Sequence, residues 1–345
     1  MPKIFTVIGA RPQFIKASPV SRALRHEGLD EVIVHTGQHF DAMMSDVFFE
    51  ELDIPKPTYN LEVNSLSHGA MTGRMLEKLE EAMLVERPDF ILVYGDTNST
   101  VAGALAGAKL NIPIAHVEAG LRSFNRRMPE EINRVVTDHV STLLLCPTQT
   151  AMANLAAEGI SKGVHAVGDV MFDTTLAAIE RSAARSTIIE ALKLQPGSYA
   201  VATVHRAENT DDVARLAQIV AWLEAAARTT PVVMPVHPRT RKLFASRGIV
   251  PAGVTLIDPV GYLDMTQLLH HAAAVFTDSG GLQKEAYFHR VPCVTLRDET
   301  EWVETVEAGW NRLWQGPDFA ERRDISDYGD GRSAQAIARL LGASL

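Results

Sequence analysis

The segment from Asp89 to Glu131 decides the fold, because it holds two short apolar runs that each lead into an acid. Residues 89–93 read Asp-Phe-Ile-Leu-Val and residues 112–117 read Ile-Pro-Ile-Ala-His-Val, with a helical run at 100–110 between them. Apolar runs of this length that alternate with helices are typical of buried parallel strands. The residues just past the carboxyl ends of such strands line the ligand site of an open α/β sheet. The sequence therefore predicts an α/β fold whose site begins where these runs end.

Three acids stand at this predicted site, namely Asp96, Glu118 and Glu130. Carboxyl groups that converge in one crevice are costly unless some stay protonated or meet cations, and such groups are candidates for proton transfer. A structural interpretation stays open for each acid alone: Asp96 can cap the helix that starts near Asn98, and Glu118 can pair with Arg122. The three acids together favour the catalytic interpretation.

Length and composition narrow the class of protein. A chain of 345 residues with 46% hydrophobic and 22% charged residues is expected to form two globular domains. The net charge of −9 argues against nucleic acid as a partner, because phosphate backbones are bound by an excess of Lys and Arg. Cys146 and Cys293 lie in apolar runs without metal or disulfide spacing. With neither a signal-peptide pattern nor an apolar run near ~20 residues, we expect a cytoplasmic protein that needs no membrane.

The first domain is predicted at residues 1–168. Its first strand, 3–9, runs into a glycine turn and a helix that starts at Pro12, and such a helix start can bind an anion. Arg11 and Lys16 add positive charge there. No dinucleotide-binding glycine fingerprint and no P-loop pattern occur, so no cofactor is expected. Further strands are predicted at 31–37, 89–93, 112–117, 142–146 and 164–167, and helices at 63–86, 100–110, 131–140 and 149–158.

The second domain is predicted at residues 169–345, after a crossover at 168–173. Its last helix, 332–341, can return to pack on the first domain. Two Rossmann-like domains that face a ligand cleft are the expected architecture. Strands are predicted at 199–204, 232–236, 254–257, 274–277 and 293–296.

The second domain carries its own ligand signals. The segment Thr277-Asp278-Ser279-Gly280-Gly281 follows a strand and opens a helix, so it offers a second anion site. Glu285, one turn later, can accept a hydrogen bond from a ribose hydroxyl or can be an ordinary first-turn acid. His205 and His237 each end a strand, where a histidine either forms structural hydrogen bonds or acts in a site. The ligand spacing of a zinc site is absent, so no metal is expected.

These motifs, in this order, resemble the non-hydrolysing UDP-N-acetylglucosamine 2-epimerases, a family with the two-domain fold of the B-type glycosyltransferases. The resemblance extends over essentially the whole chain. The matching segments are Gly9-Ala10-Arg11-Pro12, Lys16, Thr36-Gly37-Gln38-His39, Gly95-Asp96-Thr97, His116-Val117-Glu118-Ala119-Gly120-Leu121-Arg122, Pro129-Glu130-Glu131, Asn133-Arg134, His205-Arg206, Glu208-Asn209, Thr277-Asp278-Ser279-Gly280-Gly281 and Glu285.

The resemblance implies a function and a set of site residues. It implies inversion of C2 of a UDP-N-acetylhexosamine, of the UDP-GlcNAc to UDP-ManNAc type, by elimination of UDP to a glycal and re-addition. It also implies a homodimer that makes precursors of surface polysaccharides. The acid/base groups would be Asp96, Glu118 and Glu130. His205 would join these groups in the catalytic set and would also bind the nucleotide. UDP would lie on Arg11, Lys16, Ser279, Gly280, Gly281 and Glu285, with uracil near Val260 and Met265.

Three departures from the family pattern concern the sugar. Trp302 stands where the usual members carry a cation, Ala207 replaces an arginine, and the loop before Glu130 carries Arg126 and Arg127. All three resemble the branch that acts on UDP-2,3-diacetamido-2,3-dideoxyglucuronate, whose sugar has an extra carboxylate. The sequence therefore leaves open which UDP-sugar is the substrate. A glycosyltransferase and a hydrolysing epimerase are the more distant alternatives.

Overall fold

The chain forms two compact units in a computed structural model that describes residues 1–38 and 54–345, without the side chain of Arg11. The first unit comprises residues 1–176 and 326–345, and the second comprises residues 177–325. The boundary falls inside one continuous helix, α7 (Val170–Arg185), eight residues after the end of the first domain predicted from the sequence. Because the helix needs no linker of its own, the local composition does not mark the boundary.

The first unit is built on one parallel sheet. Within the described residues its strand order is β3-β2-β1-β4-β5-β6-β7, and every neighbouring pair is parallel. The strands are β1 (Lys3–Ile8), β2 (Asp30–His35), β3 (Tyr59–Asn60), β4 (Phe90–Tyr94), β5 (Ile114–Val117), β6 (Leu143–Cys146) and β7 (Val164–Ala166). The helices of this unit, besides the start of α7, are α1 (Arg11–His26), α3 (His68–Glu86), α4 (Asn98–Lys109), α5 (Pro129–Val140), α6 (Gln149–Ala157) and α15 (Ser333–Ala343).

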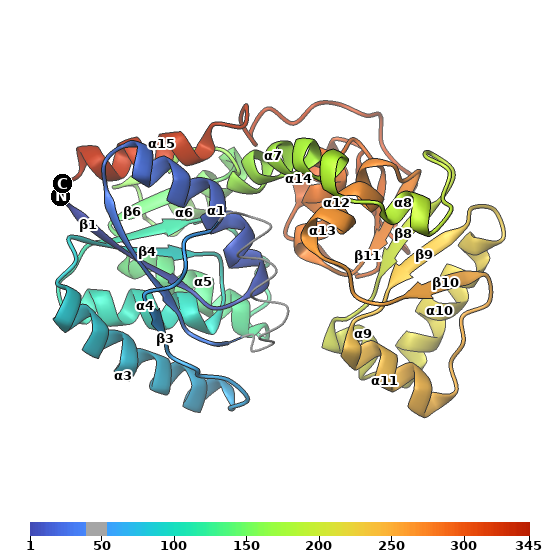
Figure 1. Ribbon diagram of the computed structural model, residues 1–345, viewed down its shortest axis with the longest axis horizontal. Helices are drawn as coiled ribbons and strands as arrows, with labels where there is room; N and C mark the ends of the chain where they lie inside the picture. Colours follow the sequence, from blue (N-terminus) through green and yellow to red (C-terminus); the bar gives the residue numbers. More distant parts are fainter. Residues whose placement is uncertain (39–53) are drawn as a thin grey trace. The chain divides into compact units, whose positions relative to one another are not determined.

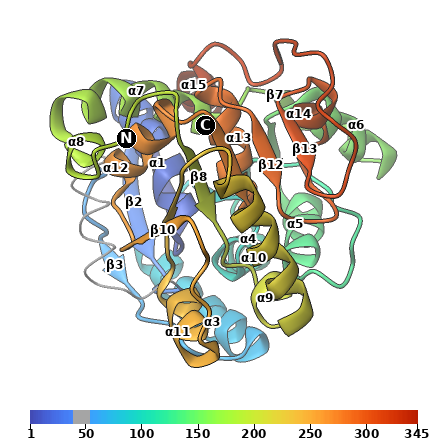
Figure 2. The ribbon, with the colours of Figure 1, turned by 90° about the vertical axis from the view of Figure 1, so that its right-hand side faces the viewer.

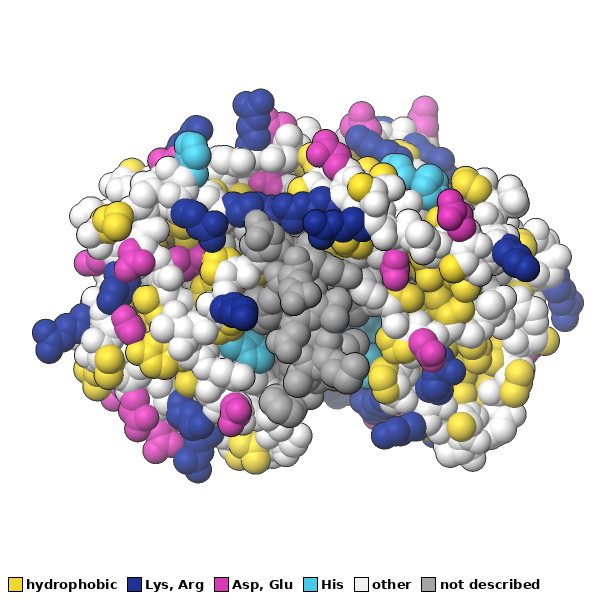
Figure 3. Space-filling model, in the orientation of Figure 1, with side chains coloured by type: hydrophobic (Ala, Val, Ile, Leu, Met, Phe, Trp, Pro, Cys, Tyr) yellow, Lys and Arg dark blue, Asp and Glu magenta, His cyan; other side chains and the backbone are white. Residues whose placement is uncertain are grey.

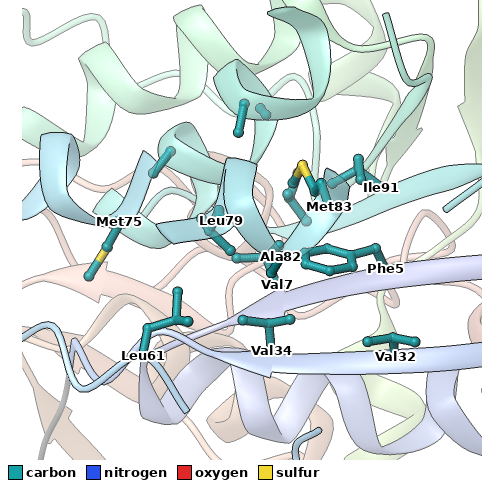
Figure 4. Packing of buried hydrophobic residues seen from close by; sticks show 14 of the residues in the cluster. Phe5, Val7, Val32, Val34, Leu61, Met75, Leu79, Ala82, Met83 and Ile91 are labelled. Atoms are coloured by element: carbon teal, nitrogen blue, oxygen red, sulfur yellow. The ribbon is translucent and has the colours of Figure 1, made fainter. Parts of the chain in front are cut away.

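Apolar side chains from α3, α4 and the sheet form one of the cores of the first unit. In Figure 4, Leu79 and Met83 of α3 point toward Phe5 and Val7 of β1, with Val34 of β2 beside them. All five side chains are buried. The 3.6-residue period of the helix and the two-residue period of the strands thus place their apolar faces against each other.

The second unit repeats the same design. Within the described residues its parallel sheet has the order β10-β9-β8-β11-β12-β13, and α10 packs on β9 and β10, on the side of the unit nearest the viewer in Figure 2. The strands are β8 (Ala200–Thr203), β9 (Val232–Pro235), β10 (Val254–Ile257), β11 (Ala274–Thr277), β12 (Cys293–Thr295) and β13 (Asn311–Leu313). The helices are α8 (Ile188–Ala191), α9 (Ala207–Thr210), α10 (Val213–Ala227), α11 (Pro238–Arg247), α12 (Tyr262–His270), α13 (Gly280–Phe288) and α14 (Val303–Glu307).

The predicted α/β fold with two parallel sheets is confirmed. Each strand predicted from an apolar run is present, and the differences are small. The strands β3 and β13, of two and three residues, were missed because so short a run carries no periodicity. Helix α3 begins at His68 and not at Val63, because Val63 is a buried residue that donates its backbone N–H to the Thr36 carbonyl.

The last helix, α15, belongs to the first unit and packs beside α1, as Figure 1 also shows. On the face shown in Figure 3, acidic and basic side chains are interspersed over each unit. Among the described helices, none is both long enough and apolar enough to cross a membrane.

Candidate active site

The strand order itself points to a site in each unit. In the first sheet the order reverses between β1 and β4, and in the second it reverses between β8 and β11. Ligands of open parallel sheets bind beyond the carboxyl ends of the strands at such a reversal. The segments found there are Gly9–Arg11, Gly95–Asp96, His205–Arg206 and Asp278–Gly280.

Asp96 follows β4 and is held by two residues of α5. Its carboxylate accepts a hydrogen bond from Arg134 Nη1, and its backbone carbonyl accepts one from Asn133 Nδ2 at 2.9 Å. Asp96 does not cap α4, because that cap is Thr97, whose hydroxyl accepts from the Thr100 N–H. The capping interpretation of Asp96 is therefore wrong, and its carboxylate is oriented by Arg134 instead.

The charges that act on Asp96 indicate that the predicted acids lie close to one another. Burial raises the pKa of its carboxyl above the usual range, and Glu118 and Glu130 raise it further. The positive charges of Arg134 and Lys16 act in the opposite direction. These interactions fall off with distance, so the three acids and Lys16 share one neighbourhood. A carboxyl whose pKa is raised in this way is suited to hold a proton for transfer.

Glu118 follows β5 and forms a buried ion pair with Lys16 of α1. The alternative partner, Arg122, bonds to Asp138 and Glu158, so the expected pairing of Glu118 with Arg122 is wrong. Gly95 allows the approach of Glu118 and Lys16. A Cβ atom on Gly95 would lie 3.3 Å from the Glu118 carboxylate and 3.4 Å from the Lys16 ammonium, and its φ of +62° also disfavours a side chain.

Glu130 lies in the first turn of α5 and is half-buried, and within the described residues its carboxylate accepts no hydrogen bond. The next residue, Glu131, is buried and fixes the preceding loop. It accepts from the backbone N–H groups of Ser123 and Phe124 at 3.0 and 2.9 Å, and from Arg134 at 2.8 Å. Although burial opposes ionisation, these donors keep the pKa of Glu131 below its usual range. Glu131 thus anchors the loop while Glu130 stays available for a ligand.

The helix start of α1 differs from the predicted anion site. The backbone N–H groups of Gly9 and Ala10 both donate to the side-chain oxygen of Gln13, at 2.8 and 3.0 Å. Gln13 in turn donates to the carbonyl of Tyr94 at 2.8 Å. These two donors therefore hold β1 to β4 and are not open to a ligand. The side chain of Arg11 and the whole of His39 lie outside the described part of the chain.

In the second unit, Asp278 orients His205. The buried Asp278 carboxylate lies 3.2 Å from Nδ1 of His205 and accepts from the backbone N–H groups of His205 and Arg206, both at 2.9 Å. Asn209 also donates to it, at 3.1 Å. Burial opposes ionisation, yet these donors keep the pKa of Asp278 below its usual range. Because Nδ1 faces Asp278 and the His205 side chain is 39% exposed, Nε2 is the ring atom left for a ligand.

The N-terminus of α13 keeps its donors open. Within the described residues, the backbone N–H groups of Gly280 and Gly281 donate to no protein acceptor, whereas Ser279 N–H donates to Thr277. Gly280 is also closely approached, because a Cβ there would lie 2.3 Å from the carboxylate of Glu301. Glu285, one turn into the helix, is buried.

Trp302, which stands where the resemblance leads us to expect a cation, covers one. The indole ring is buried and lies over the ammonium of Lys284, with Nζ 3.8 Å from the ring centroid. This cation–π contact keeps a positive charge one residue before Glu285 on α13. Val260 and Met265 belong to the packing of the same unit: Met265 is buried in a cluster with Leu268 and Val275, and Val260 packs against that cluster.

A separate pocket of about 350 Å³ lies near the ends of β8 and β12 and holds none of the predicted site residues. It is lined by Glu208, Asn209, Asp212, Arg215, Arg297, Asp298 and Glu299. Within the described residues, no group of three or more His, Cys, Asp or Glu side chains has the arrangement to hold a metal ion.

The sequence interpretation missed the residues that hold the site residues in place. Arg134 and Asp278 orient Asp96 and His205, and both stand in segments that carry the family resemblance. Gln13, which occupies the α1 donors, was not considered. The signal that could have found Asp278 is its position directly after a strand end, next to the open glycines of α13.

Comparison with known proteins identifies the family. The family model described as UDP-N-acetylglucosamine 2-epimerase matches residues 22–342. A protein of Pseudomonas aeruginosa named UDP-2,3-diacetamido-2,3-dideoxy-D-glucuronate 2-epimerase is 56% identical over 356 residues, 98% of this chain and 99% of that protein. A UDP-N-acetylglucosamine 2-epimerase homologue of Methanococcus maripaludis is 55% identical over 357 residues, with 98% and 99% coverage.

A solved structure agrees with these relatives. The crystal structure of Methanocaldococcus jannaschii UDP-GlcNAc 2-epimerase in complex with UDP-GlcNAc and UDP has a TM-score of 0.91 to this chain at 40% identity, and the match covers 99% of both chains. The family match spans most of this chain, and both relatives are covered almost from end to end. This chain belongs to the UDP-N-acetylglucosamine 2-epimerase family.

Proposed function

We propose that this chain inverts C2 of a UDP-N-acetylhexosamine, of the UDP-GlcNAc to UDP-ManNAc type, by eliminating UDP and adding it back. As a member of its family the chain is an isomerase, a UDP-sugar 2-epimerase. The observation that carries the proposed mechanism is that Glu118, with its partner Lys16, and Glu130 lie close enough to Asp96 to act on its charge.

The chemistry of the substrate calls for such a cluster. The proton at C2 is barely acidic, because no carbonyl group is attached to that carbon. Expulsion of UDP as the proton leaves gives a glycal, and the return of UDP with a proton on the opposite face gives the epimer. Carboxyl groups near C2 can take and return these protons, which is the role we assign to Asp96, Glu118 and Glu130. The raised pKa of Asp96 supports this role.

We assign the nucleotide to residues that offer positive charge or open donors. The open N–H groups of Gly280 and Gly281, with the hydroxyl of Ser279, suit the diphosphate. His205, oriented by Asp278 through Nδ1, can donate from Nε2 to the departing UDP in its imidazolium form. The negative charge that develops on UDP is where such donors lower the barrier most. Glu285 is assigned to the ribose, Arg11 and Lys16 to the nucleotide, and Val260 and Met265 to uracil.

Reaction in heavy water tests the mechanism. We expect one deuterium at C2 of the product, because the proton removed at C2 exchanges with solvent before another is added. Mass spectrometry and proton NMR of the product measure the label. Epimerised product that carries no label from solvent would require internal transfer and would overturn the elimination mechanism.

The second candidate substrate is UDP-2,3-diacetamido-2,3-dideoxyglucuronate. The relative of that name is 56% identical to this chain, whereas the Methanocaldococcus jannaschii UDP-N-acetylglucosamine 2-epimerase is 40% identical. Arg126 and Arg127 are exposed on the loop that Glu131 anchors, and arginine can bind a carboxylate through two hydrogen bonds. These observations favour the sugar that carries the extra carboxylate.

A comparison of kcat/KM for the two UDP-sugars decides between them. We expect UDP-N-acetylglucosamine to react weakly and the carboxylated diacetamido sugar to react better. Substitution of both arginines, Arg126→Ala with Arg127→Ala, should remove that preference. A preference for UDP-N-acetylglucosamine that the double variant leaves unchanged would contradict the carboxylated sugar as the substrate and favour UDP-N-acetylglucosamine.

We also propose a cytoplasmic homodimer that supplies surface polysaccharide precursors, as the family resemblance implies. Light scattering of the purified protein measures the mass of the assembly. A single-chain mass at micromolar concentration would contradict the dimer.

A further inference from the structure

A buried charged network lies behind the proposed acids of the first unit. His116 of β5 is fully buried, and both of its ring nitrogens face acceptors. Nε2 lies 2.7 Å from the carbonyl oxygen of Gly95, and Nδ1 lies 2.7 Å from the Asp138 carboxylate. Each ring nitrogen of His116 therefore has an acceptor group within hydrogen-bond distance.

Asp138 of α5 connects this histidine to the turn that follows β5. Besides His116, its carboxylate accepts from the backbone N–H of Gly120 at 3.1 Å and from Arg122 Nη1 at 2.7 Å. Burial opposes ionisation of Asp138, yet His116 and Arg122 keep its pKa below the usual range. Arg122 is held from its other side by two hydrogen bonds to Glu158.

The two ends of this network lie next to the two acids. Gly95 immediately precedes Asp96, and Gly120 stands two residues after Glu118. The sheet also bonds each turn, because Gly95 N–H donates to Val117, and the N–H groups of Glu118 and Ala119 donate to Leu145. Each turn that carries an acid is therefore bonded on one side by the sheet and on the other by the His116–Asp138 pair.

We infer that the His116–Asp138 pair is a positioning device that sets the Asp96 turn and the Glu118 turn relative to each other for the proposed epimerisation. The inference rests on the proposed function of the two acids. Neither His116 nor Asp138 touches substrate in this role, because both side chains are fully buried. Apolar residues of similar volume would fill the space at lower desolvation cost, so packing alone does not account for a buried histidine–carboxylate pair.

Two substitutions of His116 separate its two hydrogen bonds. In His116→Gln the amide nitrogen takes the place of Nε2 and can still donate to the Gly95 carbonyl. In His116→Asn the amide nitrogen takes the place of Nδ1, so the bond to Asp138 can remain while the bond to Gly95 is lost. We expect kcat to fall about 10²-fold in His116→Asn, because a misplacement of about 1 Å costs that much. The fall in His116→Gln should be similar, because the bond to Asp138 that links the two turns is lost there.

The readouts are kcat and KM for the UDP-sugar that the wild type epimerises, together with the number of UDP-binding sites per chain from calorimetric titration. The expected pattern is a lower kcat per UDP-binding site with KM changed by no more than about threefold. A variant that is only less well folded would lose binding sites and activity in the same proportion. The titration therefore keeps the test decisive even where part of a preparation is misfolded.

Asp138→Asn and Glu158→Gln complete the design. Asp138→Asn keeps the shape of the side chain but removes the negative charge of the carboxylate that bonds to His116 and to the Gly120 N–H. The value of kcat should therefore fall as in His116→Asn. Glu158→Gln weakens the distant end of the same network, which bonds to neither acid-bearing turn, and should change kcat by less than about threefold. Unchanged kcat per site in both His116→Asn and Asp138→Asn, or an equal loss in Glu158→Gln, would overturn the inference. A wild-type chain that epimerises no UDP-sugar would instead overturn the proposed function.

Discussion

Glu118 is held in a backbone conformation that a non-glycine residue rarely adopts. Its φ is +74°, in the left-handed region, and such a conformation costs about 1–3 kcal/mol. The backbone N–H groups of Glu118 and Ala119 both donate to the carbonyl of Leu145, at 3.0 and 3.3 Å, and Lys16 holds the side chain. The conformation that turns this carboxylate toward Lys16 therefore lowers the stability of the fold. Such strain is expected where a side chain belongs to a functional site.

Removing the charge of each acid should lower turnover with little effect on UDP binding. We expect Asp96→Asn, Glu118→Gln and Glu130→Gln each to reduce kcat by about 10²–10⁴, as for lost general acid/base groups. The measurement is kcat with the epimerised UDP-sugar, alongside calorimetric titration with UDP.

Glu86→Gln is the matched control for these three variants. Glu86 also pairs with a lysine of the first unit, Lys3, at 2.8 Å, but it lies at the end of α3 away from the acid-bearing turns. Its kcat should stay within about twofold of wild type. Turnover close to wild type in all three acid variants would contradict a catalytic role for Asp96, Glu118 and Glu130.

At the scale of elements, α15 depends on a cap that another helix supplies. The residue before α15, Arg332, provides no side-chain cap. The carboxylate of Asp173, in the first turn of α7, instead accepts from the backbone N–H groups of Ser333 and Ala334 at 3.2 and 2.8 Å. This bond joins the start of α15 to α7 within the first unit, across 160 residues of sequence.

Loss of that cap should loosen α15. Burial raises the pKa of Asp173 to about 6, so at pH 7.5 the carboxyl is ionised and accepts both bonds. We expect Asp173→Ala to cost about 0.5–2 kcal/mol, with Asp173→Asn closer to wild type because its amide oxygen still accepts. Urea unfolding and hydrogen exchange of the α15 amides at pH 7.5 measure the effect.

Asp330→Ala provides the comparison for Asp173→Ala. Asp330 is an exposed acid close to the start of α15 that pairs loosely with Arg332, at 3.9 Å, so its removal should change stability by less than about 0.5 kcal/mol. Equal protection of the α15 amides in Asp173→Ala and wild type would show that the cap contributes nothing.

At the scale of the whole molecule, one strand order occurs twice. Counting strands in sequence within each unit, both sheets contain the run 3-2-1-4-5-6. The order reverses beside the first strand of each sheet, and Asp96 of the first unit and the open glycines of the second follow strands at those reversals. The repeated topology thus gives each unit one ligand-binding edge, with acids on one and open donors on the other.

A buried histidine of the second unit should lower the stability of the molecule in acid. His289 is buried beside His270 and His271. Burial and those two neighbours lower its pKa from 6.5 to about 3. Between these values the unfolded chain binds a proton at this histidine that the folded chain does not bind. The contribution of His289 to stability should therefore fall as the pH falls from about 6.5, by up to about 1.4 kcal/mol per pH unit.

Replacement of His289 by leucine isolates this contribution. The free energy of unfolding, measured in urea at pH 7 and at pH 5, should fall less between the two values in His289→Leu than in wild type. Replacement of the exposed His26 by leucine is the control and should leave the wild-type dependence unchanged. An identical decrease in His289→Leu and wild type would show that His289 is protonated in the folded state.

The sequence by itself determined the alternation of strands and helices and the positions of the acids at strand ends. These features are local: the apolar runs at 89–93 and 112–117 are recognised from neighbouring residues alone, and Asp96 and Glu118 follow them within a few residues. The motifs at both reversals and their order along the chain also carried the family resemblance. For the same reason the strands too short to show a period, β3 and β13, were missed.

Only the tertiary structure decided which groups meet. Glu118 has a nearby arginine in the sequence, Arg122, yet it pairs with Lys16, which is 102 residues away. The donors of Gly9 and Ala10 looked open to an anion, yet Gln13 occupies them to reach Tyr94 on another strand. The partner of a side chain depends on which groups the folded sheet brings to one edge. It also depends on how well each contact offsets the free-energy cost of removing the side chain from water. Both are properties of contacts between distant segments, which the order of residues along the chain does not contain.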